Sequence, residues 1–550
     1  MDNVKITING VDYFTKKNTT LEEIAKEFQK NFKHPILAAK VNNALRELNY
    51  KVNKNSEIIF LDLNTRDGNK MHVNGLLFVL SVAIKELYGV RYDIKSEHSI
   101  DKGLYIKTNF ELTENRLNDI KEKMKEIIKQ NRPIKKLIVD RLEARDYFSK
   151  IDYKSKVNIL KYTTNTYITL YQLGDFYDYF YTKMPIYTGL LGEFDLTYLS
   201  TEGLVLRYPT IYSNDEIKEF QNHPNMMRAF DISSKWNNLM KVRDASELNA
   251  LVSTGKIDQF IKIAESRQND ELINLAKKIK ENKKVKVVLL AGPSSSGKTT
   301  TSKKICMYLR SLGSKPQVIS MDDYFVERDE TPLDENGKPD YECLEAVDLK
   351  LFDKNVEALL NNEEIDIPTY NFLTGKKEFS KKMKLEKTGV LVIEGIHALD
   401  EKVLANIPRE NVFRIYISPL AELNIDNHNY ISTTDNRLLR RIVRDNKTRG
   451  HSVNRTISTW PEVRKGEEKY IFPYQDNADY TFNSALIYEI GVLKTYVEPL
   501  LYSVDPRDSC YEEAKRLINF LGFFLPIPSD AIPDESILRE FIGGSFFTDL

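Results

Sequence analysis

Cysteine is scarce in this 550-residue chain, and the three residues that occur form no recognisable pattern. Cys306, Cys343 and Cys510 show neither paired spacing nor a metal-ligand motif, so we expect reduced thiols in a cytoplasmic protein. An excess of charge of one sign is also lacking, because 80 Lys and Arg residues balance 80 Asp and Glu residues. The chain therefore has no global field that would attract nucleic acid or an anionic membrane.

Long hydrophobic runs are missing as well. No run approaches the roughly 20 apolar residues that span a bilayer. The first residues, MDNVKITING, show no charged-then-apolar signal segment. We therefore expect a cytoplasmic protein with no membrane partner. The chain is too long for one hydrophobic core, so about three domains are expected.

The first 64 residues have the pattern of a small β-grasp domain. Val4–Ile8 alternates as a strand does, and Ile58–Leu63 is a returning strand. Between them, Thr20 and Glu23 have the spacing of a capping box that begins a helix. The segment carries no nucleophile, metal cluster or phosphate loop, so we interpret it as a binding module.

Residues 65–225 are predicted to form a mixed α+β domain, with helices around Asn74–Leu87 and Glu114–Lys129. The aromatic residues of Phe176–Tyr181 form either a stacking surface or half-buried strand positions, and we favour the strand. Residues 226–280 are charged and predicted to form a helical linker.

From residue 281 to about 500 the pattern changes to strand, glycine-containing turn, helix and strand. Four short β-branched runs lack polar alternation: Val285–Leu290, Gln317–Ser320, Val390–Ile393 and Val412–Ile417. Such runs are typical of strands covered on both faces, which predicts an α/β domain with a parallel sheet flanked by helices. Residues 501–550 form a C-terminal extension around Leu517–Leu525, whose role the sequence does not indicate.

The segment Gly292–Thr299 satisfies the phosphate-loop pattern G-x-x-x-x-G-K-S/T. It follows an apolar strand and begins a helix, as the motif requires. Backbone N–H groups and the helix N-terminus would hold phosphates, Lys298 would reach the β- and γ-phosphates, and Thr299 would bind Mg²⁺. The alternative is a tight turn with no ligand. The predicted ATP-binding residues are Gly292, Ser294, Ser295, Ser296, Gly297, Lys298, Thr299 and Thr300.

Acidic residues follow two strands of the same region. Asp322 and Asp323 come after the second strand, and Glu394 ends the strand Val390–Ile393. A carboxylate at such a strand end can accept a hydroxyl proton and help to hold Mg²⁺. The alternatives are a turn or helix cap for the Asp pair and a solvated Glu394.

Four arginines share one predicted helical face through i, i+3, i+4, i+7 spacing: Arg437, Arg440, Arg441 and Arg444. Arg449 follows shortly afterwards. Like charges repel unless anions neutralise them, and Asp435 and Asp445 are candidates for part of that role. We interpret the cluster as a movable arginine lid over the triphosphate, with a solvated basic face as the alternative.

Residues from about 283 to 485 resemble the uridine kinase and phosphoribulokinase family of P-loop kinases. The matching motifs, in order, are GPSSSGKTT, SMDDYF, PDYECLEAVDL, PTYNF, VIEGIHAL, RLLRRIVRDNKTRG and ADYTF. The resemblance implies ATP and Mg²⁺ as cofactors, with Thr299, Asp322 and Glu394 around the metal. It implies a catalytic set of Asp322 as base, Lys298, Arg441, Arg444 and Arg449. The implied substrate residues are Asp322, Tyr324, Glu342, Tyr370, Phe372 and Arg441.

Two of these substrate residues have specific implied roles. Glu342 stands where uridine kinases have an Asp that grips the ribose hydroxyls, and Tyr370 stands where an aromatic residue contacts the base. The chain departs from the family pattern at Gly375, where a base-reading His is expected, and at His451, where another lid Arg is expected. Both departures put the pyrimidine preference in doubt.

The N-terminal half resembles that of threonyl-tRNA synthetases. Residues 1–64 look like their TGS domain and about 70–210 like the domain that follows, through His72–Gly75, Glu97–Tyr105 and Met184–Gly189. The editing site of that family uses an H-x-x-x-H pair with a later Cys and His. Here Leu76 replaces the second His, so we expect no aminoacyl editing and no zinc site.

The sequence therefore predicts an ATP-dependent kinase that phosphorylates a hydroxyl of a nucleoside-like small molecule. The alternative is a regulatory NTP-binding protein whose N-terminal half senses RNA, the ribosome or a nucleotide signal. RNA or a nucleotide is an expected candidate ligand of that half, and a homo-oligomer is compatible with the sequence.

Overall fold

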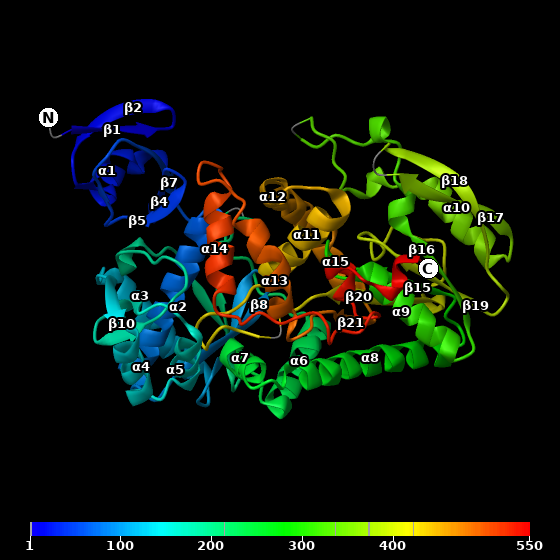
Figure 1. Ribbon diagram of the computed structural model, residues 1–550, viewed down its shortest axis with the longest axis horizontal. Helices are drawn as coiled ribbons and strands as arrows, with labels where there is room; N and C mark the ends of the chain where they lie inside the picture. The colour runs from blue at the N-terminus through cyan, green and yellow to red at the C-terminus, as the bar shows by residue number, and fades with distance from the viewer. Residues whose placement is uncertain (1–2, 214, 336, 372–373, 422, 550) are drawn as a thin grey trace.

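The computed structural model describes residues 3–213, 215–335, 337–371, 374–421 and 423–549, and Figure 1 shows how its parts are arranged. The N-terminal part is a five-stranded mixed sheet in the order β2-β1-β7-β4-β5. Its strands are β1 (Asn3–Ile8), β2 (Val11–Lys16), β4 (Ala38–Val41), β5 (Ala44–Glu47) and β7 (Ser56–Leu61), beside the short pair β3 (Thr19–Thr20) and β6 (Lys51–Val52). Helix α1 (Leu21–Phe28) begins at the predicted capping box of Thr20 and Glu23. The predicted elements are present, and the likeness to TGS domains stays a prediction.

The second region contains two antiparallel sheets, in the orders β13-β14-β9-β8 and β10-β11-β12. Its strands are β8 (Ile94–Ile100), β9 (Gly103–Thr108), β10 (Lys135–Asp140), β11 (Tyr167–Leu173), β12 (Phe176–Asp178), β13 (Asp195–Ser200) and β14 (Gly203–Arg207). Its helices are α2 (Arg66–Tyr88), α3 (Glu114–Lys129), α4 (Arg141–Lys150) and α5 (Lys154–Ile159). Both predicted helices are confirmed, and α3 covers the predicted range.

Helix α2 is, among the residues that the structure describes, the one helix long and apolar enough to cross a membrane. Its most apolar stretch has a mean hydropathy of 1.2, and 78% of that stretch is buried inside the protein. Leu76, Leu80 and Ile84 lie in the core of the second region. A helix surrounded by protein needs apolar residues on all faces, which accounts for this hydropathy.

The aromatic residues of Phe176–Tyr181 are half-buried or buried rather than presented as a stacking surface. Phe180 is in the core, and Tyr179 and Tyr181 both place their rings against Phe523 of the C-terminal extension, with centroids 5.8 and 6.3 Å apart. The strand interpretation is therefore confirmed for Phe176–Asp178, which form β12, whereas Tyr179–Tyr181 follow the strand and pack on a segment about 340 residues later in the chain.

Three helices connect the second region to the third: α6 (Pro224–Met240), α7 (Ala245–Ser253) and α8 (Ile257–Glu281). In Figure 1, α8 runs along the lower edge of the molecule toward the third region. Its apolar residues Leu272, Leu275 and Ile279 pack in one core with the start of the next sheet. The charged stretch is thus helical, as predicted.

The third region is built on a parallel sheet in the order β16-β19-β15-β20-β21. Its strands are β15 (Val287–Ala291), β16 (Lys315–Ser320), β19 (Gly389–Glu394), β20 (Val412–Ser418) and β21 (Tyr480–Asn483). The helices are α9 (Lys298–Ser311), α10 (Leu349–Leu360), α11 (Thr433–Arg449) and α12 (Val453–Tyr470), with a hairpin of β17 (Glu364–Asn371) and β18 (Lys376–Lys384). The predicted α/β fold is confirmed.

Strand β15 shows why apolar runs without alternation mark this sheet. Val287, Leu289 and Ala291 belong to one hydrophobic core, whereas Val288 and Leu290 belong to another on the opposite face. Helices cover both faces, so neither face of the strand is exposed to water.

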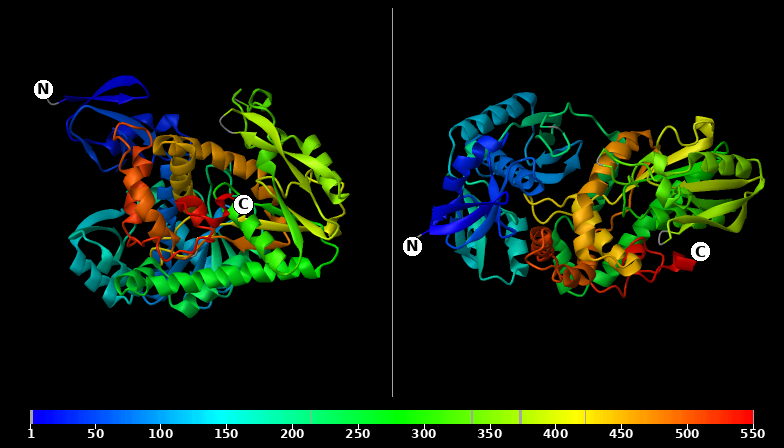
Figure 2. Two further views of the ribbon diagram at one scale, coloured as in Figure 1. Left: turned by 45° about the vertical axis from the view of Figure 1, so that its right-hand side comes forward. Right: turned by 90° about the horizontal axis from the view of Figure 1, so that it is seen from above.

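The C-terminal extension packs against the rest of the molecule. It follows α13 (Glu489–Leu501) and contains α14 (Tyr511–Leu521) and the short α15 (Arg539–Ile542). One hydrophobic core joins Leu517 and Phe541 of the extension to Leu438 of α11 and Phe260 of α8. Its last part, red in Figures 1 and 2, lies beside α9 and α11.

Candidate active site

The phosphate loop connects β15 to α9 at the carboxyl edge of the parallel sheet. Gly297 has φ +85° immediately before α9, a conformation that favours glycine. Gly292 is required for another reason, since a Cβ atom there would lie 2.1 Å from the backbone oxygen of Ile417. These two glycines let the backbone curl closely between the strand and the helix, as the motif predicted.

Three consecutive carbonyls of the loop accept hydrogen bonds from its outer side. Arg437 Nε donates to the oxygen of Ser294 (2.9 Å), Arg440 Nη1 to that of Ser295 (3.4 Å) and Ser484 Oγ to that of Ser296 (2.5 Å). The backbone N–H of Ser294 is held as well, since it donates to Glu467 Oε1 at 3.2 Å. These contacts fix the backbone of the loop in place.

Lys298 and Thr299 make short-range contacts at the start of α9. Lys298 is buried, and its Nζ donates to the carbonyls of Gly292 (2.9 Å) and Pro293 (3.3 Å). Thr299 Oγ1 donates to Glu394 Oε1 at 3.3 Å. The hydroxyl predicted to bind a metal thus lies beside the predicted acidic strand end.

Glu394 ends β19 in register with Ser320, the last residue of β16. Ser320 Oγ donates to Glu394 Oε1 at 3.0 Å. Burial and, next, the negative charge of Asp322 together raise the pKa of Glu394 to about 7, although the charge of Lys298 opposes both. This buried carboxylate is sensitive to pH near neutrality.

Asp322 lies just after β16 in a short 3-10 turn, where its N–H donates to Ser320 Oγ at 3.3 Å. Its charge raises the pKa of both Glu394 and Glu342. The pKa of Glu342 is raised to about 7, first by burial and next by Glu467, whereas Arg441 and Lys298 lower it. The charges of Lys298 and Asp322 therefore act on both buried carboxyl groups, those of Glu342 and Glu394.

The predicted aromatic substrate residues fall in different places. Tyr324 is fully buried: its ring packs on Phe352 with centroids 5.1 Å apart, and Asn355 Nδ2 donates to its hydroxyl at 3.1 Å. The structure therefore places Tyr324 in the core and not beside the carboxylates. Tyr370, on β17, is also mostly buried, and its N–H donates to Asp323 Oδ1 at 3.2 Å. Phe372 lies outside the described residues.

The arginine face of α11 divides into two groups. Arg437 and Arg440 are fully buried and pair with Glu467 of α12 and Glu489 of α13. The sequence did not indicate either glutamate, because neither belongs to a recognised motif.

The second group gathers near the end of α11. Arg441 Nε, Arg444 Nη2 and Arg449 Nε lie 3.3, 2.7 and 3.7 Å from the oxygens of Asp445. Arg441 also donates to Ser294 Oγ at 2.9 Å, which connects this group to the phosphate loop. The predicted neutralising role of Asp445 is confirmed.

Asp435 does not join that group. Its carboxylate lies 2.7 Å from Arg516 of α14 and 3.6 Å from Arg66 of α2. The prediction that Asp435 helps to neutralise the arginine face is therefore wrong. Asp435 lies in the first turn of α11, where its partners come from the C-terminal and N-terminal parts of the chain.

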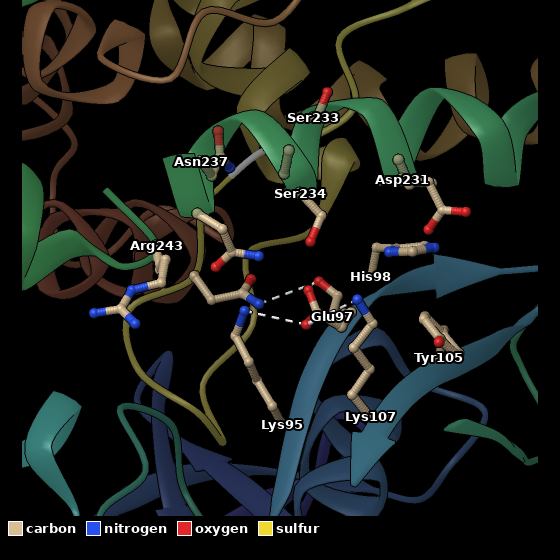
Figure 3. A pocket seen from close by; sticks show the side chains of 14 residues that line it. Lys95, Glu97, His98, Tyr105, Lys107, Asp231, Ser233, Ser234, Asn237 and Arg243 are labelled. Carbon is tan, nitrogen blue, oxygen red and sulfur yellow. Dashed lines mark hydrogen bonds and ion pairs between the residues drawn. The ribbon is translucent and has the colours of Figure 1, made fainter. Parts of the chain in front are cut away.

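A separate small cavity lies between β8, β9 and α6 (Figure 3). Its volume is about 30 Å³, which is room for about two water molecules and not for a nucleoside. Lys95 and Lys107 point toward Glu97 there, and the ring of His98 stacks on Phe230 with centroids 3.3 Å apart. We therefore assign the candidate active site to the phosphate loop.

The N-terminal histidine singled out above is a buried core residue. His72 Nε2 accepts the N–H of Gly192 at 3.1 Å. Burial lowers the pKa of His72 to about 4, with a smaller effect from His34. The ring is therefore neutral and acts as a hydrogen-bond acceptor inside the second region.

The parallel sheet, the phosphate loop and the acidic strand ends define a P-loop kinase. The model of the phosphoribulokinase / uridine kinase family matches residues 287–489. The uridine kinase of Limosilactobacillus reuteri (strain DSM 20016) is 30% identical over 203 residues, which cover 36% of this chain and 84% of the relative. That of Staphylococcus haemolyticus is 29% identical over 194 residues, covering 35% and 84%. The chain therefore belongs to the phosphoribulokinase / uridine kinase family and is a phosphotransferase with an alcohol acceptor.

A solved structure of a candidate uridine kinase from Bacillus stearothermophilus is 22% identical and covers 36% of this chain and 89% of its own length. Its TM-score is 0.24, so the family assignment depends on the sequence matches. The match of the family model falls within the third region of the chain.

Proposed function

We propose that this chain transfers the γ-phosphoryl group of ATP to a hydroxyl of a nucleoside-like small molecule in the cytoplasm. The observation that carries the proposal is the phosphate loop itself, whose three consecutive carbonyls are fixed by hydrogen bonds from two arginines of α11 and from Ser484. Glu394 accepts a hydrogen bond from Thr299 at the end of that loop, and the charges of Lys298 and Asp322 act on the carboxyl groups of Glu394 and Glu342. The relatives named above are uridine kinases, which supports a nucleoside as acceptor.

Each side chain has a chemical task in this proposal. Asp322 accepts the proton of the acceptor hydroxyl, the oxygen then forms a bond to the γ-phosphorus, and the bond to the β–γ bridging oxygen breaks to release ADP. Lys298 exchanges its loop carbonyls for phosphate oxygens. Arg441 and Arg444 balance the charge of the transferring group. Glu342 is the candidate partner of the acceptor's hydroxyl groups.

The residues present fit a magnesium ion. Mg²⁺ takes oxygen ligands and is usually held by one or two carboxylates together with substrate phosphates and waters. The Thr299 hydroxyl and the Glu394 carboxylate are already 3.3 Å apart, and the charge of Asp322 acts on Glu394. When bound there, the ion would neutralise phosphate charge.

A matched pair of variants tests the assignment of the base. The purified full chain is assayed with ATP and a panel of nucleosides, beside Asp322→Asn and Asp323→Asn. Loss of the base should lower kcat on the order of 10²–10⁴-fold in Asp322→Asn. Asp323→Asn keeps an acceptor for the Tyr370 N–H and should stay within about tenfold of the wild type. Near-normal turnover by Asp322→Asn would rule out this role.

Binding of RNA or a nucleotide by the N-terminal half stays a prediction, as does self-association. Tight nucleotide binding without phosphorylation of any acceptor, together with RNA that co-purifies, would favour the regulatory alternative. Acceptor-dependent ATP consumption would favour the kinase.

A further inference from the structure

The C-terminal extension places a carboxylate on the phosphate loop's helix. Glu540 of α15 accepts two hydrogen bonds from Thr300, from its backbone N–H at 3.1 Å and from its hydroxyl at 2.8 Å, both at Oε2. Thr300 lies in the first turn of α9, two residues after Lys298. An anionic side chain thus uses donors that the sequence assigned to a nucleotide.

Apolar anchors fix the backbone of the extension at this place. Ile537 and Phe541 are fully buried. A Cβ atom on Gly297 would lie 2.6 Å from Ile537 Cγ2, and the ring of Phe541 lies 4.8 Å from the guanidinium carbon of Arg440. The extension therefore packs directly on the loop, close to the residues that shape it.

The position of Glu540 is chemically that of a phosphate. The first N–H groups of a helix point at an anion, and the helix dipole favours its negative charge. A phosphate oxygen bound to Thr300 needs the same donors, so it and Glu540 cannot use them together. Glu540 occupies only one end of the loop: the hydroxyls of Ser295 and Ser296 are buried and have no hydrogen-bond partner among the residues that the structure describes.

We propose that Glu540 is an autoinhibitory carboxylate that holds a phosphate position at Thr300 and must leave it before a nucleoside triphosphate binds. The inference rests on the proposed function, because it concerns the same nucleotide site. Glu540 is half-buried, whereas Ile537 and Phe541 are fully buried. A rotation of the glutamate side chain is therefore sufficient for release, and the anchors stay in place.

The test measures ATP binding rather than turnover. Titration calorimetry with ATP and Mg²⁺ compares the full-length wild type with Glu540→Ala, Glu540→Gln and Asp534→Ala. Asp534 is the matched control, because it is an exposed carboxylate of the same extension. Removing the competing charged hydrogen-bond acceptor should lower the Kd for ATP about tenfold in Glu540→Ala and less in Glu540→Gln. Asp534→Ala should stay within about twofold.

The double variant Lys298→Ala/Glu540→Ala shows whether ATP binds at the phosphate loop. Loss of Lys298 should abolish the tighter ATP binding that Glu540→Ala produces alone. Circular dichroism checks that each variant is folded. If Glu540→Ala does not fold, the comparison of ATP binding between Glu540→Gln and the wild type tests the proposal. Unchanged or weaker ATP binding in the folded variants overturns the proposal. Tighter binding without phosphorylation of any nucleoside would instead overturn the proposed function and leave this inference standing. If neither wild type nor variant binds ATP, both fail.

Discussion

His428 lies in a buried network of charges between the second region and the loop that leads into α11, and its replacement should change how stability depends on pH. Its Nε2 faces Asp93 Oδ1 at 3.0 Å, and its Nδ1 faces Asp178. Both ring nitrogens meet carboxylates, so the ring is doubly protonated and cationic. Buried charges of this kind stabilise a fold only while they remain paired.

The neighbouring groups reinforce this arrangement. Tyr153 donates its hydroxyl to Asp93 at 2.7 Å, and Lys156 lies 2.6 Å from Asp178 and 3.1 Å from Asp426. Lys85 lies 3.6 Å from Asp93. The network joins residues of the N-terminal half to Asp426 and His428 of the kinase region.

The magnitude follows from the pKa of His428. Burial lowers this pKa, but Asp178 and Asp93 raise it more strongly, from an ordinary value of 6.5 to about 9. That difference corresponds to about 3 kcal/mol of unfolding free energy. Because the pKa is raised in the folded state, the contribution is complete below pH 6.5 and is lost as the pH rises through about 9.

Urea denaturation of the wild type and of His428→Asn, measured from pH 6 to 9.5, tests this reasoning. The wild type should be more stable than the variant at pH 6 by about 3 kcal/mol, and the gap should nearly close by pH 9.5. The control is His451→Gln: burial lowers the pKa of this partly exposed residue, so its replacement should not alter the slope above pH 7. A gap that is constant across the range would refute a cationic His428.

Two further predictions concern the third region. Arg440→Met should lower the free energy of unfolding by about 3–5 kcal/mol, because Glu489 stays buried without its cation. Arg441→Met should cost less stability, because Asp445 keeps Arg444 and Arg449 as partners, and should reduce kcat instead; equal stability losses in urea would contradict this division. The pKa of Glu394, raised to about 7 by burial and Asp322, predicts that kcat/KM rises with pH up to about 7 and then levels off, since the ionised carboxylate attracts Mg²⁺. In Glu394→Gln the rise of kcat/KM below pH 7 should disappear. A wild-type kcat/KM that stays constant from pH 6 to 8 would contradict the assignment of that rise to Glu394.

The elements of the third region could be predicted closely because their signals are local. The apolar runs of β15 and β19 and the glycine pattern at Gly292 and Gly297 each lie within a few residues of one another. The capping box at Thr20 could be predicted for the same reason, because its two residues lie three positions apart in the sequence. These local patterns do not predict the order of the strands in the sheet, because β15 pairs with β19 and β20, which lie far away along the chain.

The missed site residues share one property, which is distance along the chain. Glu467 is 30 residues from Arg437, Glu489 is 49 from Arg440, and Glu540 is 240 from Thr300. An isolated acidic residue in a charged sequence gives no sign of such a partner. Tyr324 shows the opposite error, in which a residue of a recognised motif is assigned to the substrate site although it lies in the core. Such a motif contains reactive side chains and also the core residues that hold them in place.

The arginine helix shows how structure changes the meaning of a periodic pattern. The spacing of its arginines suggested a movable lid over the triphosphate. Arg437 and Arg440, however, are tied both to buried glutamates and to carbonyls of the phosphate loop. Moving α11 as a rigid body would break two buried ion pairs, each costing about 3–5 kcal/mol. We therefore expect any closure over a nucleotide to involve the arginine side chains around Asp445, because their movement would leave the two buried ion pairs of Arg437 and Arg440 intact.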